Sequence, residues 1–382
     1  VAGTCQVTGG TTASCTVTTT TVTWNGTIPA GQSVSIRYSA QVGNAVYIGT
    51  QFCITSTANF DSDNNGSNET SYSRQDCSSV TCPPVGPGII PPNGSGCSIL
   101  VYPIYTSNPG NPAGQNTRIN LTNINPSKPS AVHLFFVDGA TCSVADAYVC
   151  LTPNQTTSFL ASDMDPGITG YMVAVAVDAT GCPIDFNYLI GDEYVKFDTG
   201  HRGNLTADCV PGVAGGLPQC DGNSTTATLN FDGVSYGRLP MTVAADNLPS
   251  RADGNDTLLI LNRLSGNLGN GMDRLNPIFG ILYDDVENAL SFTLNPGTCQ
   301  MRGSINNGFP RTVPRFEIAV PTGRSGWMKM YSTNAAVNGA TINQNPNAST
   351  NSNAFVGAHN THTLTLAPNS TMIMPVFPPN CL

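Results

Sequence analysis

One stretch of the chain places oxygen-bearing side chains at alternate positions, a pattern suited to binding a hard cation. Asp61, Asp63 and Asn65 precede a glycine, and Glu69 follows three residues after that glycine. Calcium takes about six to eight oxygen ligands, which short loops supply from alternating Asp and Asn side chains before a glycine turn. The sequence therefore predicts a calcium site at Asp61, Asp63, Asn65 and Glu69. Tyr72 stands where a helix–loop–helix site carries its bidentate glutamate, so Glu69 would take that role; a solvated turn is the alternative.

A second motif, Gly233-x-Ser235-x-Gly237, matches the pattern that holds a nucleophilic serine between a strand and a helix. The residues that follow, 238–243, contain a proline and predict a strand instead of a helix, which favours a chance match over a hydrolase. The four histidines are His133, His201, His359 and His362. His359 and His362 lie in an Asn/Thr-rich segment without a helical pattern, so we expect a solvated loop and no helix-borne metal ligands.

Two pairs of adjacent carboxylates, Asp192 with Glu193 and Asp284 with Asp285, could in principle do acid–base chemistry. Neighbouring residues of a strand point to opposite faces, so the two members of a pair do not share a site. We therefore expect no catalytic residues and no enzymatic activity. A secreted hydrolase assembled from distant segments remains an alternative.

The surface chemistry excludes several kinds of partner. Only 10% of the 382 residues are charged, against about 25% in an average globular protein, and 24 acidic residues outnumber 15 basic ones. Without a basic stripe, neither nucleic acid nor an anionic membrane surface is an expected partner. The three lysines are Lys128, Lys196 and Lys329. Lysine commonly guards exposed sheet edges and is depleted at interfaces, so its scarcity fits lateral or end-to-end contacts; compositional drift is the alternative.

Thirteen cysteines, without a CxxC pair or metal-ligand spacing, predict disulfides and hence an extracellular or cell-surface location. The sequence has no basic-then-apolar leader and no apolar run of about 18 residues, so we expect a processed chain without membrane insertion. Sequons for N-linked glycans recur at Asn25, Asn68, Asn120, Asn204, Asn255 and Asn369.

Proline and glycine divide the chain. Residues 78–96 are rich in both and predict a semi-stiff linker, while residues 209–220, between two cysteines, predict a connecting loop. We therefore expect a partial β-sandwich at 1–77, a β-sandwich domain at 97–208 and another at 221–382.

Alternation of polar and apolar residues predicts strands in every segment. We expect them at 33–42, 52–60, 131–137, 258–261, 278–283, 315–320 and 363–366, with an apolar and central strand at 171–177. Residues 166–175 and 322–330 each place a Gly-x-x-Gly turn before an aromatic residue and an apolar strand, and each follows a strand of the type 119–121 or 259–262. Duplication of one sandwich would explain the similarity; convergent turn chemistry is the alternative that we favour.

Three segments of the first eighty residues resemble a known family. Residues 4–9, residues 21–34 with a Pro-Ala-Gly turn, and the Asp/Asn-rich loop 61–70 are similar to the later strands of the immunoglobulin-like conserved repeat domain of bacterial surface and secreted proteins. The resemblance covers about residues 1–77 and implies a sandwich whose leading strands are missing from this stretch. The remainder, with 134–139, 159–163 and 190–193, resembles uncharacterised bacterial secreted proteins, which implies no activity.

Residues 1–96 hold an odd number of cysteines: Cys5, Cys15, Cys53, Cys77 and Cys82. We favour Cys5 with Cys15 and Cys53 with Cys77, which leaves Cys82 over; pairing of Cys82 with Cys97 is the competing arrangement.

These observations predict an all-β protein of tandem antiparallel, immunoglobulin-like sandwiches, the first incomplete and completed by a strand from a neighbouring chain. We expect a structural subunit of an extracellular filament or surface layer, a head-to-tail homopolymer built by strand complementation. Candidate donor strands are 1–8 and 371–377. The alternative is a secreted adhesive or carbohydrate-binding protein with glycans as partners, for which the sequence offers Trp24 and Trp327 but no clustered row of aromatic residues.

Overall fold

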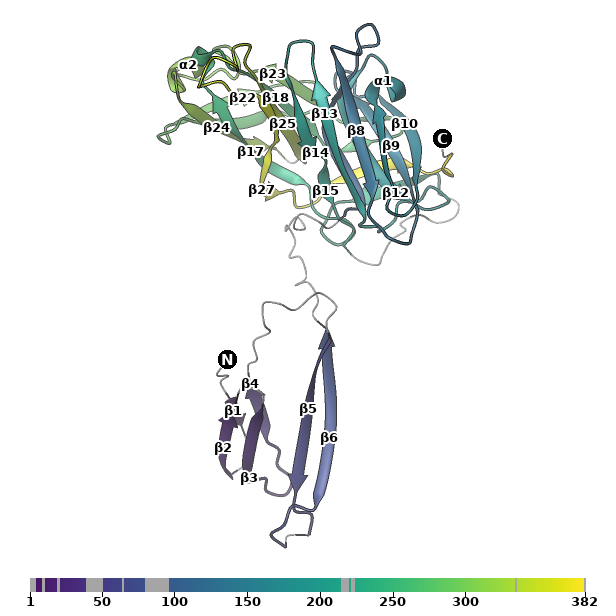
Figure 1. The fold of residues 1–382 in the computed structure, drawn as a ribbon, viewed down its shortest axis with the longest axis vertical. Coiled ribbons are helices and arrows are strands. Elements are labelled where there is room, and N and C mark those ends of the chain that lie inside the picture. The colour runs from purple at the N-terminus through teal and green to yellow at the C-terminus, as the bar shows by residue number, and fades with distance from the viewer. Residues whose placement is uncertain are drawn as a thin grey trace. The chain divides into compact units, whose positions relative to one another are not determined.

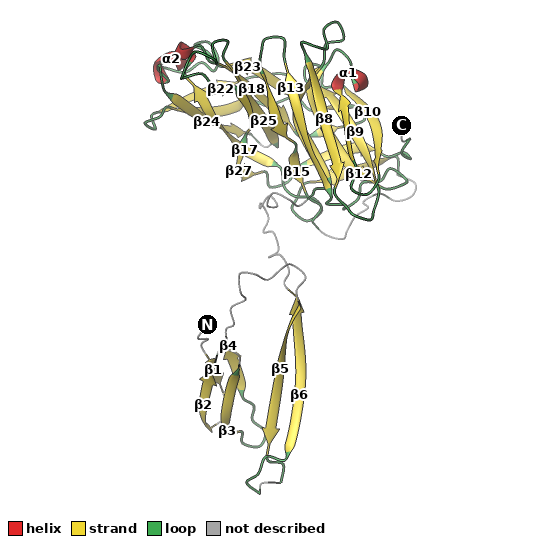
Figure 2. Ribbon diagram, in the orientation of Figure 1, coloured by secondary structure: helices red, strands yellow, loops and turns green. Residues whose placement is uncertain are grey.

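The structure is a computed structural model that describes residues 5–8, 11–18, 21–38, 51–63, 65–79, 96–213, 220, 224–333 and 335–380. The chain divides into two compact units, Val1–Pro84 and Val85–Leu382, and the division falls within the predicted linker. Nearly all of the regular structure is antiparallel β-sheet, as the sequence predicts (Figure 2).

The described part of the first unit consists of two-stranded antiparallel sheets (Figure 1). These sheets pair β1 (Cys5–Thr8) with β4 (Ser35–Tyr38), β2 (Thr11–Val17) with β3 (Val22–Thr27), and β5 (Gln51–Phe60) with β6 (Thr70–Ser79). The predicted Cys53–Cys77 disulfide joins β5 to β6. Cys15 is also disulfide-bonded, but the side chain of Cys5 and the whole of Cys82 lie outside the described residues.

The first half of the second unit is a sandwich of two sheets. Its elements are β7 (Ile99–Thr106), β8 (Asn116–Asn123), β9 (Ser130–Asp138), β10 (Val144–Leu151), β11 (Thr156–Leu160), α1 (Ala161–Met164), β12 (Thr169–Val177), β13 (Leu189–Lys196), β14 (Arg202–Thr206) and β15 (Asp208–Val210). One sheet has the order β10-β9-β12-β7-β15, and the other β11-β8-β13-β14. Leu134 and Met172 from the first sheet pack against Ile119 and Leu121 from the second. As predicted, β12 is central and buried on both faces.

A second sandwich follows. Its elements are β17 (Pro240–Pro249), η1 (Arg251–Asp253), β18 (Asp256–Arg263), β21 (Ile278–Tyr283), β22 (Ala289–Leu294), β23 (Gln300–Ser304), α2 (Phe316–Ala319), β24 (Ser325–Ser332), β25 (Val337–Gln344), β26 (Gly357–Asn360) and β27 (His362–Leu366). The sheets have the orders β22-β21-β24-β17-β27 and β23-β18-β25-β26. Leu282 and Met330 from one sheet pack against Leu259 and Leu261 from the other.

The two sandwiches follow one topology, strand for strand. In both, the fourth, third, sixth, first and ninth strands form one sheet in that order, and the fifth, second, seventh and eighth form the other. A four-residue helix lies between the fifth and sixth strands of each. The similar sequences at 166–175 and 322–330 run into the equivalent strands β12 and β24, and 119–121 and 259–262 lie in the equivalent β8 and β18. A repeated arrangement therefore accompanies the sequence similarity.

A third layer covers the outer face of the first sandwich. It comprises β16 (Thr226–Asn230), β28 (Thr371–Pro375), β19 (Gly266–Asn267) and β20 (Gly271–Met272). Leu229, Met372 and Met374 from this layer pack against Phe135 and Val173 of the sheet beneath. The C-terminal candidate donor strand is therefore not free to join another chain: β28 pairs with β16 and β19 of its own chain, and Met372 and Met374 are buried beneath it. Residues 5–8 of the other candidate pair with β4.

The two sandwiches share an interface, which we call the seam: Ile104, Val195 and Leu205 from the first pack against Ile260, Ala340 and Ile342 from the second. Polar residues extend the contact. Asn262 donates through Nδ2 to the carbonyl oxygen of Pro103 (2.8 Å), and Asn338 to Asp208 Oδ2 (2.7 Å). Residues 97–208 and 221–382, expected as separate domains, therefore lie in one compact unit.

Two sequence-based predictions of local structure need correction. Residues 315–320 are not a strand: Phe316, Ala319 and Val320 are buried at helical spacing, and residues 316–319 form the short helix α2. His359 and His362 do not lie in a loop, because they belong to β26 and β27.

Candidate functional site

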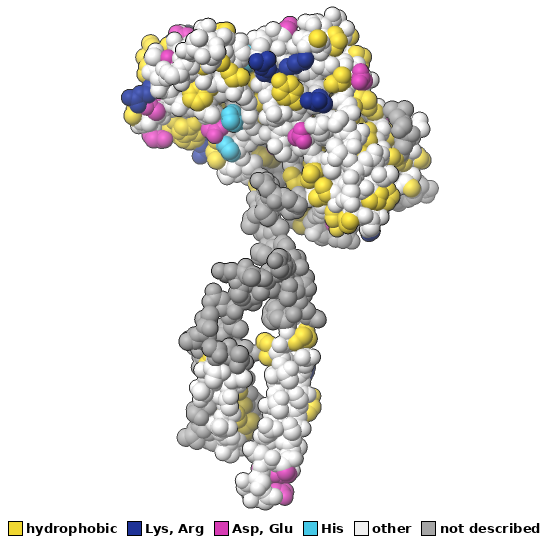
Figure 3. Space-filling model, in the orientation of Figure 1, with side chains coloured by type: hydrophobic (Ala, Val, Ile, Leu, Met, Phe, Trp, Pro, Cys, Tyr) yellow, Lys and Arg dark blue, Asp and Glu magenta, His cyan; other side chains and the backbone are white. Residues whose placement is uncertain are grey.

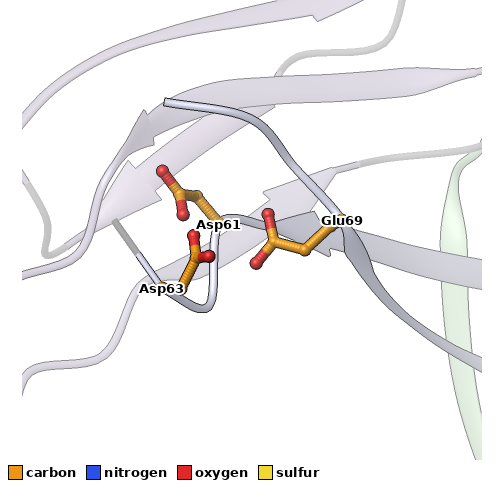
Figure 4. Close-up of side chains that lie close together, drawn as sticks. All are labelled: Asp61, Asp63 and Glu69. Atoms are coloured by element: carbon orange, nitrogen blue, oxygen red, sulfur yellow. The ribbon is translucent and has the colours of Figure 1, made fainter. Parts of the chain in front are cut away.

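The acidic loop joins β5 to β6 and brings three of the four predicted calcium ligands together. One carboxylate oxygen from each of Asp61, Asp63 and Glu69 lies within 4.8 Å of the others (Figure 4). In the described part of the chain, no other group of three acidic, histidine or cysteine side chains comes as close. The fourth predicted ligand, Asn65, donates through Nδ2 to Asp63 Oδ2 (3.0 Å), while its Oδ1 accepts from the Ser67 amide. Asn65 therefore braces the loop through its side-chain amide.

Backbone amides hold these carboxylates in place. The amide of Gly66 donates to Asp61 Oδ2 at 2.7 Å, and Gly66 has a positive φ of 92°, which favours glycine here. The side chain and amide of Ser62 donate to Glu69 Oε1 and hold the pKa of Glu69 below its usual value. The loop thus holds three neighbouring carboxylates, those of Asp63 and Glu69 exposed, of the kind that weak calcium sites use.

A cavity of about 550 Å³ lies between the two sandwiches. His201, from the β13–β14 connection, is buried there, with Nδ1 2.8 Å from Thr199 Oγ1 and Nε2 3.2 Å from the carbonyl oxygen of Asp256. Burial lowers the pKa of His201. Burial would raise the pKa of Asp256, but hydrogen bonds from Ser304 and Arg251 outweigh it and lower that pKa. At neutral pH the cavity therefore holds a neutral histidine and an ionised aspartate.

This cavity does not assemble a nucleophile. The Ser304 hydroxyl donates to Asp256 and not to His201, and Arg251 also donates to that carboxylate (2.8 Å). Gln300 lines the same cavity, is buried, and has no hydrogen-bond partner for its Oε1. The arrangement offers hydrogen-bonding groups to a polar molecule and no aligned acid, base and nucleophile.

A smaller cavity of about 360 Å³ is lined by His359, His362 and Asp246. Figure 3 shows two histidine side chains, in cyan, beside an acidic one on this face. His362 Nε2 lies 3.2 Å from Asp246 Oδ2, and both side chains are at least half exposed. The pair is accessible to solvent, but the three residues do not converge closely enough to share a metal ion.

The other candidates from the sequence have structural roles. His133 is fully buried, with Nε2 2.8 Å from Asp146 Oδ2 and its ring stacked on Tyr148 (centroids 4.0 Å apart), and burial lowers its pKa. Ser235 lies in a turn in which its amide donates to Asp232, and no helix follows it. Glu193 is buried whereas Asp192 is exposed, so these two carboxylates face opposite ways as expected.

A row of aromatic side chains, which the sequence analysis missed, lies on the outer face of the β21–β24 pair. The aromatic row consists of Phe279, Tyr283, Trp327 and Tyr331. Tyr283 and Trp327 stack across the strands with centroids 4.3 Å apart and an interplanar angle of 11°. Phe279 is 44% exposed and lies beside Tyr331, over which Lys329 Nζ sits 5.0 Å from the ring centre. The only signal in the sequence is alternation: in both strands the aromatic residues alternate with buried ones.

Comparisons with known proteins assign the chain to no family. No protein-family model, curated protein or solved structure matches the chain. Among the described residues, no helix is long and apolar enough to cross a bilayer.

Proposed function

We propose that the protein is a structural subunit of an extracellular assembly, a filament or surface layer, in which a neighbouring copy completes the first unit by β-strand addition. The observation that carries this proposal is the missing core: of the residues of Val1–Pro84 whose burial is described, none is buried. An isolated two-stranded sheet is marginal in water, and stable sheets need further strands or another layer. The disulfides and the resemblance to surface repeat domains support an extracellular setting.

The β5–β6 ribbon supports contact with a partner because its two faces differ. The cross-strand register places Ile54, Ala58, Phe60 and Tyr72 on one face. Ile54 is 41% exposed, Phe60 47% and Tyr72 65%. The opposite face carries serine, threonine, glutamine and asparagine beside the Cys53–Cys77 disulfide. Arg74 and Asp76, which form an exposed ion pair, share the first face, so its apolar part centres on Ala58, Phe60 and Tyr72. Covering this exposed apolar part with a second layer stabilises the ribbon.

Both edges of the ribbon also support strand addition. Within the described residues, β5 and β6 hydrogen-bond only to one another. Each therefore has one row of backbone donors and acceptors free for a further strand. Neither flank of this ribbon is protected by lysine, because the three lysines all lie beyond residue 127.

A matched pair of substitutions tests the proposal. Tyr72→Asp puts a charge on the apolar face, and Ser71→Asp puts the same charge on the polar face one residue away. In light scattering and native mass spectrometry over a concentration series, we expect the unmodified protein and Ser71→Asp to assemble and Tyr72→Asp to stay monomeric. A monomer at every concentration for the unmodified protein, or equal assembly by both variants, would contradict the proposal.

The aromatic row favours a second candidate function, an adhesive or carbohydrate-binding protein. Aromatic rings pack against the apolar faces of sugar rings, while tyrosine hydroxyls and the tryptophan N–H donate hydrogen bonds. Trp327→Ala should abolish binding to an oligosaccharide array if this row binds glycans. Tyr188→Ala, at another exposed aromatic residue of the same unit (42% exposed), serves as the control. Equal glycan binding by both variants would argue against this function.

A further inference from the structure

Two cysteines of the second unit are left after the disulfides are assigned. Residues 97–382 contain eight cysteines. Disulfides join Cys97 to Cys209 and Cys182 to Cys220, and Cys150 is also disulfide-bonded. Among the described residues, Cys142 and Cys299 remain as thiols, and both are buried. A chain rich in disulfides is exposed to oxidising conditions, under which two neighbouring thiols are unusual because they tend to form a disulfide.

The two thiols meet although 156 residues separate them, since Cys142 belongs to the first sandwich and Cys299 to the second. Cys142 lies in the β9–β10 turn, and Cys299 directly precedes β23. Both side chains lie in one buried cluster, and burial, reinforced by the neighbouring Cys142 thiol, raises the pKa of Cys299. The Cys299 thiol also lies 3.1 Å from the carbonyl oxygen of Asp138 in the same turn.

Backbone hydrogen bonds fix the two segments against each other. The amide of Gln300 donates to the carbonyl oxygen of Gly139 (3.1 Å), and the amide of Met272 donates to that of Cys142 (2.9 Å). The residue after Cys299 is therefore bound to the β9–β10 turn that carries Cys142, and Cys142 itself is bound to β20 of the covering layer. These backbone contacts hold the two cysteine-bearing segments side by side.

Cys142 is also held in an unusual backbone conformation. Its φ is 68°, in the left-handed region, which a side-chain-bearing residue adopts at a cost. Backbone hydrogen bonds from the Cys142 amide to the carbonyl oxygen of Asp138 (2.9 Å) and from the Met272 amide to the carbonyl oxygen of Cys142 (2.9 Å) maintain this conformation.

We propose that Cys142 and Cys299 form a disulfide that covalently joins the two sandwiches in the secreted protein. The reaction breaks both S–H bonds and forms one S–S bond, with release of two protons. The two electrons and the two protons pass by thiol–disulfide exchange to a protein or small-molecule disulfide, whose S–S bond breaks and which leaves as two thiols. Because both cysteines are buried in the docked structure, the bond forms while the sandwiches come together. The bond would lie next to Gly139 and Gln300, two of the residues that line the 550 Å³ cavity.

Peptide mapping of the full chain tests this pairing. The protein is exported through an oxidising compartment, denatured without reductant in iodoacetamide, and cut after Arg and Lys and before Asp. These cuts place Cys142 in residues 138–145, apart from Cys150 and Cys182, and Cys299 in residues 285–302. We expect mass spectrometry to find these two peptides joined, and to find each alkylated only after reduction. The Cys97–Cys209 and Cys182–Cys220 disulfides are internal controls in the same digest.

Two results would overturn the proposal. One is alkylation of both Cys142 and Cys299 before reduction while the control disulfides stay intact. The other comes from Cys299→Ser, which should leave Cys142 open to alkylation after denaturation. If Cys142 stays protected in that variant, it pairs with a different cysteine. The reciprocal Cys142→Ser variant should expose Cys299 in the same way, and neither result requires the variants to be as stable as the unmodified protein.

Discussion

The side-chain amide of Asn338 donates to the carboxylate of Asp208 across the seam, with Nδ2 2.7 Å from Oδ2. Asn360 donates to the other oxygen of the same carboxylate at 3.1 Å. On the far side of Asn338, Asn262 and Gln300 continue the row through side-chain hydrogen bonds of 3.0 and 2.8 Å. Asp208 of the first sandwich thus lies at one end of a chain of hydrogen-bonded side-chain amides, which runs across β25, β18 and β23 of the second sandwich.

Because the Asp208 carboxyl is buried, we expect the protein to lose stability as the pH rises. Burial raises the pKa of Asp208 from its usual value to about 6, against the lowering effect of Asn338 and Asn360. As the pH rises, the Asp208 carboxyl of the unfolded chain therefore loses its proton before that of the folded protein. The stability that the protonated Asp208 contributes is fully present below about pH 4 and is lost as the pH passes 6. Relative to Asp208→Asn, we expect the free energy of unfolding of the unmodified protein to fall by about 2 kcal/mol between pH 4 and pH 7. Urea titrations of both proteins at several pH values would measure this difference in unfolding free energy. The prediction is contradicted if the unfolding free energies of the two proteins change in parallel with pH.

Glu193 should behave as a neutral acid at neutral pH. It is fully buried, one of its oxygens accepts from the Ile104 amide (3.3 Å), and the other has no hydrogen-bond partner. Burial raises the pKa of Glu193 well above its usual value. Glu193→Gln, which keeps the shape and the acceptor, should change stability at pH 7 by less than about 1 kcal/mol, whereas Glu193→Lys should prevent folding. A large loss for Glu193→Gln would mean that the charged form is needed.

The seam predicts that the two sandwiches unfold together. Ile260 lies in the cluster that both sandwiches share, so Ile260→Ala should cost about 2 to 5 kcal/mol. Hydrogen exchange should accelerate in β8 and β9 of the first sandwich as well as in β18 and β25. Leu259→Ala, directed into the core of the second sandwich alone, is the matched comparison. Faster exchange confined to the second sandwich after Ile260→Ala would show that the halves are independent.

The acidic loop should bind calcium weakly. Three carboxylates within 4.8 Å of one another form an exposed site of the extracellular type, for which dissociation constants of about 10⁻⁴ to 10⁻³ M are usual. Calorimetry should detect this binding, and Asp61→Asn with Asp63→Asn should remove it. Asp284→Asn is the control, because Asp284 also caps an exposed turn through amides of Val286 and Asn288. No heat in the millimolar range, or equal loss in the control, would identify the loop as a turn alone.

The sequence predicted those features that depend on local pattern. The strand β21 coincides with the expected 278–283, because alternation along one strand is local. The Cys53–Cys77 disulfide was also predicted, since the two residues flank one hairpin. The helix α2 was missed because its burial at residues 316, 319 and 320 spans a single turn, too short for a periodic signal.

Long-range features could not be predicted in this way. The aromatic row joins Tyr283 to Trp327, and the seam joins Asp208 to Asn338; both depend on how sheets pair and pack. The shared topology of the two sandwiches was visible only as a short similarity at two turns. Strand order depends on contacts between distant segments, which alternation within one strand does not encode.

The layer that covers the first sandwich also defines how the second is attached. β16 and β28 are neighbours in that layer, and where they part, the amide of Phe231 donates to the carbonyl oxygen of Ser370 at 2.8 Å. The chain between these two residues forms the second sandwich, and on the way it returns to the layer, where β19 pairs with β28. The second sandwich is therefore inserted between two strands of the layer that covers the first, and the inserted segment itself supplies two strands of that layer. Deleting the insertion would thus strip part of the cover from the first sandwich.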